Sequence, residues 1–97
     1  MEFEWDEEKR QQNIRHRRVD FVIAAQIFHG SVTVREDKRY AYGERRFRAL
    51  GEFEGQHYVV AYTLRGQVHR IVTAWAVGQK GAKRYKALFA RRSGSDA

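Results

Sequence analysis

The sequence predicts an α+β domain: a four-stranded antiparallel meander sheet with two N-terminal helices and one C-terminal helix. The hydrophobic pattern changes from a helical period to strict alternation near residue 31, and returns to a helical period near residue 78. The 97 residues are 42% hydrophobic and include thirteen aromatic side chains, which is enough for one small core. We therefore expect a single domain over residues 1–92 and a flexible tail at residues 93–97.

The N-terminal part is predicted to hold a short strand and two helices. Phe3–Trp5 is the expected strand. Asp6 is a good N-cap for a helix over Glu7–Arg17, whose acidic first turn and basic last turn both suit the helix dipole. Asp20 caps a second helix that ends at Gly30. Its apolar positions share one face: Ile23, Ala24, Ile27 and Phe28.

Alternation of apolar and polar residues predicts four strands in the middle of the chain. They cover Ser31–Arg35, Glu44–Leu50, His57–Leu64 and Gln67–Ala76. Glu36–Gly43 and Gly51–Gly55 are the expected connections, and Arg65-Gly66 is expected to form a tight hairpin loop. The final helical pattern predicts a helix over Gln79–Arg92.

The predicted hairpin determines which side chains share a face. With Arg65-Gly66 as a two-residue loop, Tyr62 would pair with His69, and Arg70 would lie on the other, mostly aliphatic face. The first face would carry the rings, the histidine and a hydroxyl: Tyr58, Val60, Tyr62, Leu64, His69, Ile71, Thr73 and Trp75. Aromatic and basic groups on a sheet suit single-stranded RNA, because any base can stack there. The alternative is that these rings form a core beneath a helix.

The charge distribution favours a nucleic acid or an acidic protein as partner. Lys and Arg number 19 against 12 Asp and Glu, and five of those acids lie within Met1–Glu8. The chain has no cysteine, which excludes disulfide scaffolds, thiolate nucleophiles and cysteine-ligated zinc. The longest uncharged stretch, Phe21–Val34, is fourteen residues and too short to span a bilayer. We expect a cytoplasmic protein without membrane contact.

Five segments, in order, resemble BrnT-type toxins. They are Phe3–Lys9 with Asn13, Val19–Phe21 with Ala24-Ala25, Tyr42–Gly51, Val59–Gly66 and Arg70–Ala74. Tyr85 lies where the closing helix of that family often has a tyrosine. The resemblance implies a RelE-like fold and ribonuclease activity on RNA without a cofactor. It also implies a ribbon-helix-helix antitoxin that neutralises the toxin, within a toxin-antitoxin heterotetramer, and represses the operon.

The chain departs from the family pattern at three places. His16–Arg18 stands where the family usually has Lys-His-Gly, and Gly81 stands where a glutamate is common. Thr73–Trp75 replaces the usual Ser-Ala-Arg, which keeps a hydroxyl but removes a cation that could hold a phosphate. The alternative function is therefore a catalytically weakened relative that binds RNA or antitoxin. An RNA-binding module unrelated to toxins would fit the aromatic face but not the five ordered matches.

Metal-independent RNA cleavage needs a base for the 2′-hydroxyl, cations for the phosphorane and an acid for the leaving oxygen. The candidate catalytic residues are Arg46, Arg70, Glu44, His69, Thr73 and Tyr85. The candidate RNA-binding residues are Arg48, Arg65, Lys80, Lys83, Tyr62 and Trp75. No metal site is expected, because the four histidines lack the spacing of a metal-binding helix.

Each of the leading candidates also has a structural interpretation. Glu44 and His69 are the possible bases, and His69 could also be the acid, as could Tyr62 and Tyr85. Glu44 could instead pair with its neighbouring arginines, and His69 could be a packing residue. Arg46 and Arg70 match arginines of the family pattern, although the predicted register would make Arg70 a structural anchor.

Overall fold

The computed structural model describes residues 1–95, and the side chains of residues 1–90 among them. Its elements are β1 (Glu2–Glu4), α1 (Glu7–Arg17), α2 (Phe21–Ala24), the 3-10 helix η1 (Ala25–His29), β2 (Thr33–Asp37), β3 (Arg46–Phe53), β4 (Gln56–Arg65), β5 (Val68–Val77) and α3 (Gln79–Ser95). The α+β class is confirmed. Among the described residues, no helix is both long enough and apolar enough to cross a membrane.

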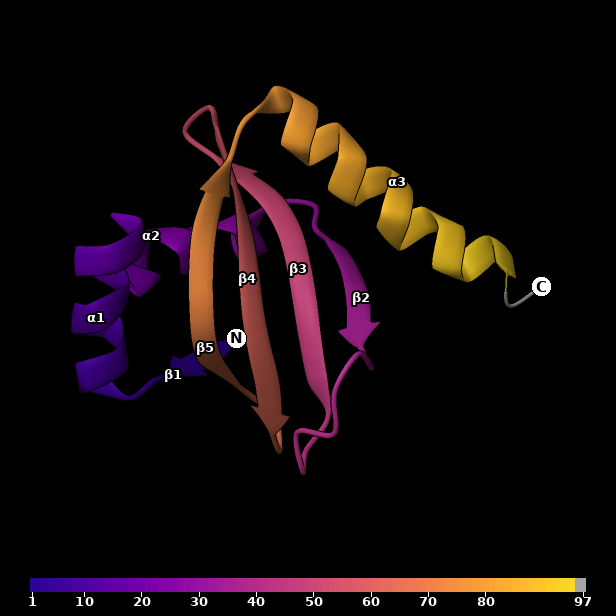
Figure 1. Cartoon of the computed structure of the whole chain (residues 1–97). Helices are drawn as coiled ribbons and strands as arrows, with labels where there is room; N and C mark the ends of the chain where they lie inside the picture. Colours follow the sequence, from indigo (N-terminus) through magenta and orange to yellow (C-terminus); the bar gives the residue numbers. More distant parts are fainter. Residues whose placement is uncertain (96–97) are drawn as a thin grey trace.

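The sheet has five strands in the order β1-β5-β4-β3-β2 (Figure 1). Strands β2 to β5 form the predicted antiparallel meander. The prediction of only four antiparallel strands is wrong, because β1 joins β5 in parallel, with Phe3 opposite His69 and Glu4 opposite Arg70. A three-residue strand has too little periodicity to indicate its partner, so the sequence predicts the strand but not its place in the sheet.

The helices begin where predicted but differ in length and type. Asp6 and Asp20 cap α1 and α2, each accepting a hydrogen bond of 2.9 Å from the backbone N–H two residues later. The second predicted helix is a single α-helical turn that continues as η1. Helix α3 extends to Ser95 rather than ending at Arg92, and residues 96–97 of the predicted tail lie outside the described residues. The domain boundary stays a prediction.

The loop between β4 and β5 differs from the predicted one. Arg65 pairs with Val68, so the two-residue loop is Gly66-Gln67 instead of Arg65-Gly66. Gly66 has a φ of 61°, a left-handed conformation that glycine adopts without strain. Tyr62 consequently pairs with Ile71 and not with His69. The loop moves by one residue and the register by two, so side chains near the loop keep their predicted faces.

A β-bulge then changes the faces along the rest of β5. Val72 is the extra residue, and beyond it Ala61 pairs with Thr73. A shift of one residue turns every following side chain to the other face. The predicted aromatic face is therefore wrong, because Thr73 and Trp75 lie on the opposite side of the sheet from Tyr62.

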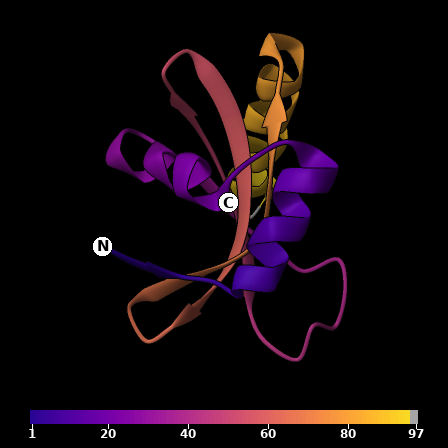
Figure 2. The same cartoon turned by 90° about the vertical axis from the view of Figure 1, so that its left-hand side faces the viewer.

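The two faces of the sheet are covered by different helices. Figure 2 shows α2 and η1 on one side of the sheet and α3 on the other, with α1 near β5. The side under α2 and η1, called the core face below, holds the main core: Val19, Phe21, Ala24, Ala25, Ile27, Ala49, Val60, Tyr62, Ile71 and Ala74. Gly51 permits this close packing, because a Cβ there would lie 2.7 Å from the Cβ of Ile27.

Helix α3 covers only part of the opposite side. Its contact with the sheet is a smaller core of Leu50, Val59, Ala82 and Phe89. Trp75, Val77 and Tyr85 pack against this cluster. In Figure 1, α3 begins above the upper end of the sheet, after β5, and runs obliquely down past β2.

Candidate active site

Five arginines project from the side of the sheet that α3 partly covers. One of them, Arg35 of β2, pairs with Arg48 and donates to the Leu88 carbonyl of α3 at 3.0 Å. Arg46 and Arg48 are two residues apart on β3 and therefore share a face. Arg48 pairs with Ala61, and Arg70 pairs with Thr63, which places Arg70 on the same side. Arg65 lies two residues beyond Thr63 on β4. We call this side the arginine face. Arg70 thus points away from the core face, not toward it.

Two carboxylates accompany these arginines. Glu44 accepts a hydrogen bond from Nε of Arg46 at 2.9 Å. Glu4, on β1, accepts one from Arg70 at 2.7 Å and lies 3.9 Å from Arg65. The side chains of Arg46 and Arg70 are 25% and 28% exposed, so an anion from solvent can reach them. The face combines several cations with two possible proton acceptors.

Arg48 differs from the other arginines because aromatic rings hold it. Its guanidinium carbon lies 6.0 Å from the ring centre of Tyr85 and 5.7 Å from that of Phe89, within cation–π range. Its buried Nε has no hydrogen-bond partner among the described residues. A buried N–H without an acceptor costs free energy, and a phosphate oxygen is a suitable acceptor for it.

Asp37 organises the connection that carries Glu44. It accepts hydrogen bonds from Arg39 Nε at 2.9 Å and from the hydroxyl of Tyr42 at 2.9 Å. These partners, Arg39 above all, hold the pKa of Asp37 well below its usual range. The guanidinium of Arg46 lies 4.4 Å from the ring centre of Tyr42. A buried carboxylate thereby positions the ring on which Arg46 rests.

Tyr62 and His69 lie on the core face, across the sheet from the arginines. Tyr62 is only 5% exposed. The His69 ring packs 4.9 to 5.6 Å from the rings of Tyr62, Phe28 and Phe3, measured between centroids. Burial raises the pKa of Tyr62 and lowers that of His69. The structure therefore places both side chains among core rings, away from the surface where the arginines gather.

Thr73 and Trp75 lie beside α1, next to the arginine face. The hydroxyl of Thr73 donates to Oδ1 of Asn13 at 2.8 Å. The guanidinium of Arg17 lies 5.1 Å from the ring centre of Trp75, and the Tyr85 ring lies 6.5 Å away on the α3 side. These positions form a border of the arginine face between α1 and α3.

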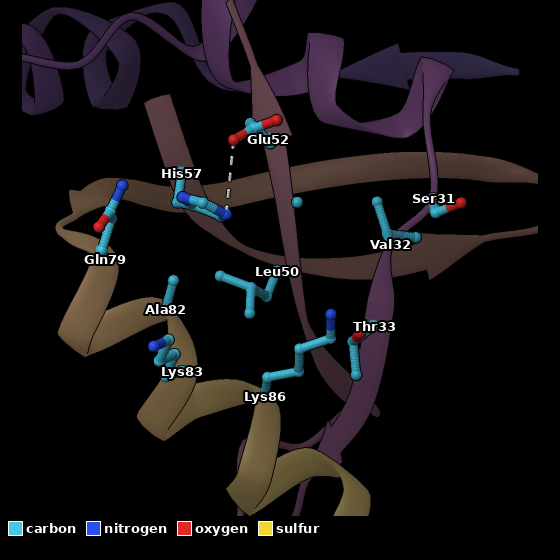
Figure 3. Close-up of a pocket in the computed structure, with 11 residues that line it drawn as sticks. Ser31, Val32, Thr33, Leu50, Glu52, His57, Gln79, Ala82, Lys83 and Lys86 are labelled. Carbon is cyan, nitrogen blue, oxygen red and sulfur yellow. Dashed lines mark ion pairs between the residues drawn. The ribbon is translucent and has the colours of Figure 1, made fainter. Parts of the chain in front are cut away.

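The two lysines of α3 are placed differently from Tyr85. Lys80 is exposed, and Lys83 lines a groove of about 640 Å³ between α3 and the strands β2 and β3 (Figure 3). At one end of this groove His57 lies 3.7 Å from the Glu52 carboxylate. Because each residue turns a helix by about 100°, Lys83 and Tyr85 lie on opposite flanks of the buried stripe. Lys83 is therefore not directed toward the arginine face, although it is only two residues from Tyr85 in the sequence.

Sequence reasoning does not single out Glu4, Asn13 or Arg17 as functional candidates. All three reach β5 from the N-terminal segments. Their positions depend on how β1 and α1 meet β5, and no local pattern signals that contact. The resemblance includes Asn13 but does not indicate its role.

A family model described as "Ribonuclease toxin, BrnT, of type II toxin-antitoxin system" matches residues 5–80. The match includes all five arginines of the arginine face and Trp75, and it ends before Tyr85. No curated protein matches the chain.

Proposed function

The chain belongs to the BrnT family of ribonuclease toxins of type II toxin-antitoxin systems, and we propose that it is a RelE-like, metal-independent endoribonuclease whose site is the arginine face. The observation that carries this proposal is the gathering of Arg46, Arg48, Arg65 and Arg70 on one side of the sheet. Preorganised cations that meet a developing phosphorane are the main requirement of this chemistry.

Each residue has a proposed role in the reaction. Glu44 takes the proton of the 2′-hydroxyl, and the 2′ oxygen attacks the adjacent phosphorus. Arg46, Arg70 and Arg48 stabilise the charge on the phosphorane oxygens. The bond from phosphorus to the 5′ oxygen breaks, and the Tyr85 hydroxyl protonates that oxygen. The products are a 2′,3′-cyclic phosphate and a 5′-hydroxyl end.

A catalytically weakened relative is the second candidate function. Its specific support is that Glu44 and Glu4 already neutralise Arg46, Arg70 and, at longer range, Arg65. A phosphate must compete with these carboxylates, which lowers its affinity. Such a chain would bind RNA or its antitoxin through the same face without cutting.

We also propose a ribbon-helix-helix antitoxin that covers the arginine face with acidic residues, in a toxin-antitoxin heterotetramer. The cations of the arginine face support an acidic partner surface. Co-expression of the two chains, followed by light scattering, measures the mass of the complex. Charge reversal by Arg46→Glu is expected to weaken the complex, and an unchanged affinity would show that the antitoxin docks elsewhere.

Incubation of the purified chain with single-stranded RNA in excess chelator tests the proposed activity. We expect fragments with cyclic phosphate ends, and no cleavage when the nucleotide at the cut site lacks its 2′-hydroxyl. Binding without cleavage would favour the weakened relative. Neither binding nor cleavage would contradict both candidates.

A further inference from the structure

We infer that a second phosphate-binding subsite lies in the cleft between α1 and the bulge of β5, with Arg17 as its main ligand. This subsite rests on the proposed function, since its ligand is a backbone phosphate of the same RNA strand. The cleft has a volume of about 240 Å³ and borders the arginine face at Thr73. It would hold a phosphate one or more nucleotides away from the reacting one.

Trp75 holds the Arg17 side chain in place. The guanidinium lies 5.1 Å from the centre of the indole ring, and no carboxylate among the described residues pairs with it. A guanidinium that stacks on a ring keeps its N–H donors free in its own plane. Arg17 is therefore restrained and still available to an anion, in contrast to Arg46 and Arg70, whose donors already meet carboxylates.

Further nitrogen-bearing side chains of α1 line the same cleft. Lys9 and His16 share its lining with Arg17, and their spacing puts them on one side of the helix. Neither forms an ion pair within the described part of the chain, although Glu7 and Glu8 directly precede Lys9. The acidic Glu7 turns instead to Arg10, at 2.6 Å. The cleft thus collects basic groups without a neutralising partner.

The contact between Arg17 and Trp75 joins α1 to the last strand. The indole ring of Trp75 is the platform for a cation that α1 supplies beside β5.

The test uses a non-cleavable RNA decamer with 2′-O-methyl groups, whose affinity is measured by fluorescence anisotropy at several salt concentrations. Arg17→Ala should weaken binding about tenfold, the effect of losing one charged hydrogen-bond partner. The slope of log affinity against log salt should fall by about 0.7, as for one lost phosphate contact on a single strand. Arg15→Ala is the matched control, because Arg15 lies on another side of the same helix and carries the same charge. Equal effects of the two substitutions would overturn the subsite.

A relocated charge gives an independent readout. Adding Trp75→Arg to Arg17→Ala should restore most of the lost affinity, whereas Trp75→Ala alone should weaken binding. A folded double variant that binds as weakly as Arg17→Ala would contradict the relocation. If the wild-type chain does not bind RNA, the proposed function fails and the subsite fails with it. If the wild-type chain binds and cuts RNA while Arg17→Ala is without effect, only the subsite is wrong.

Discussion

Asn13 of α1 binds Ala74 of β5 as a neighbouring strand would. Its Nδ2 donates to the Ala74 carbonyl at 2.9 Å, and its Oδ1 accepts from the Ala74 N–H at 3.4 Å. The same amide group also donates to the Val19 carbonyl at 2.9 Å. Strand β1 pairs with β5 only as far as Arg70, so this side chain satisfies the edge beyond it. Asn13 thereby holds α1, and with it Arg17, against the sheet.

Removing this amide should destabilise the protein. Asn13 is 7% exposed, and Asn13→Ala leaves buried backbone groups of Ala74 without partners. We expect the free energy of unfolding to fall by about 2–3 kcal/mol, measured by urea denaturation. Gln12→Ala, at the exposed neighbouring position, should change it by less than about 0.5 kcal/mol. Similar losses in both variants would show that the amide contacts contribute little.

Arg18 ends α1 in a conformation that disfavours its side chain. Its φ is 60°, and its N–H donates to the Ile14 carbonyl at 3.0 Å. A residue with a Cβ pays about 1 kcal/mol in this left-handed region, whereas glycine does not. Arg18→Gly should therefore raise the free energy of unfolding by about 0.5–1 kcal/mol in thermal or urea melts. Arg18→Ala keeps the Cβ and should not stabilise, and stabilisation by both would point to charge as the cause.

Asp37 should make the free energy of unfolding decrease at acidic pH. Its pKa is lowered by Arg39 in the folded chain, so its contribution is present above the ordinary value of 3.8 and is lost as the pH falls below it. Asp37→Asn should lower the free energy of unfolding by about 1–2 kcal/mol at pH 7. Urea melts at pH 7 and at lower pH should show this difference shrinking below pH 3.8. A difference that does not change with pH would contradict the ionic role of Asp37.

His69 should affect the stability of the protein but not RNA cleavage. Burial lowers its pKa from 6.5, so protonation of the unfolded chain favours unfolding as the pH falls below that value. His69→Phe removes this effect. As the pH is lowered from about 7 to about 5, the free energy of unfolding of the variant should fall less than that of the wild type. RNA cleavage should persist, because His69 lies on the core face. Complete loss of cleavage in a folded variant would restore His69 as a catalytic candidate.

Local patterns predicted the elements that local interactions determine. The caps at Asp6 and Asp20 and the four strands of the meander follow from neighbouring residues alone. The bulge at Val72 does not, because it inserts one residue without interrupting the apolar pattern of β5. That single residue separates Trp75 from the face of Tyr62. The sequence also does not predict that β1 pairs with β5.

The same limit applies to the candidate site. Alternation places Arg46 and Arg48 together, and the structure adds Arg65 and Arg70 to their side. Residue type alone makes His69 a candidate acid or base, yet its surroundings are determined by Phe3 and Phe28, which are distant in sequence. Glu4 and Arg17 reach the site through contacts between the N-terminal segments and β5. The sequence gives the chemistry of each side chain. It does not predict which side chains from distant segments come together in the fold.

Arg45 and Arg46 form a matched pair for testing whether the arginine face cuts RNA. Arg46 belongs to that face, whereas Arg45 pairs with Glu36 at 3.0 Å and lies over the ring of Phe47 on the core side. The direct measurement is the rate of RNA cleavage by each purified alanine variant, with thermal midpoints as the check on folding. We predict a loss of about a hundredfold for Arg46→Ala and less than about twofold for Arg45→Ala. Equal rates for the two variants would contradict the assignment of activity to the arginine face.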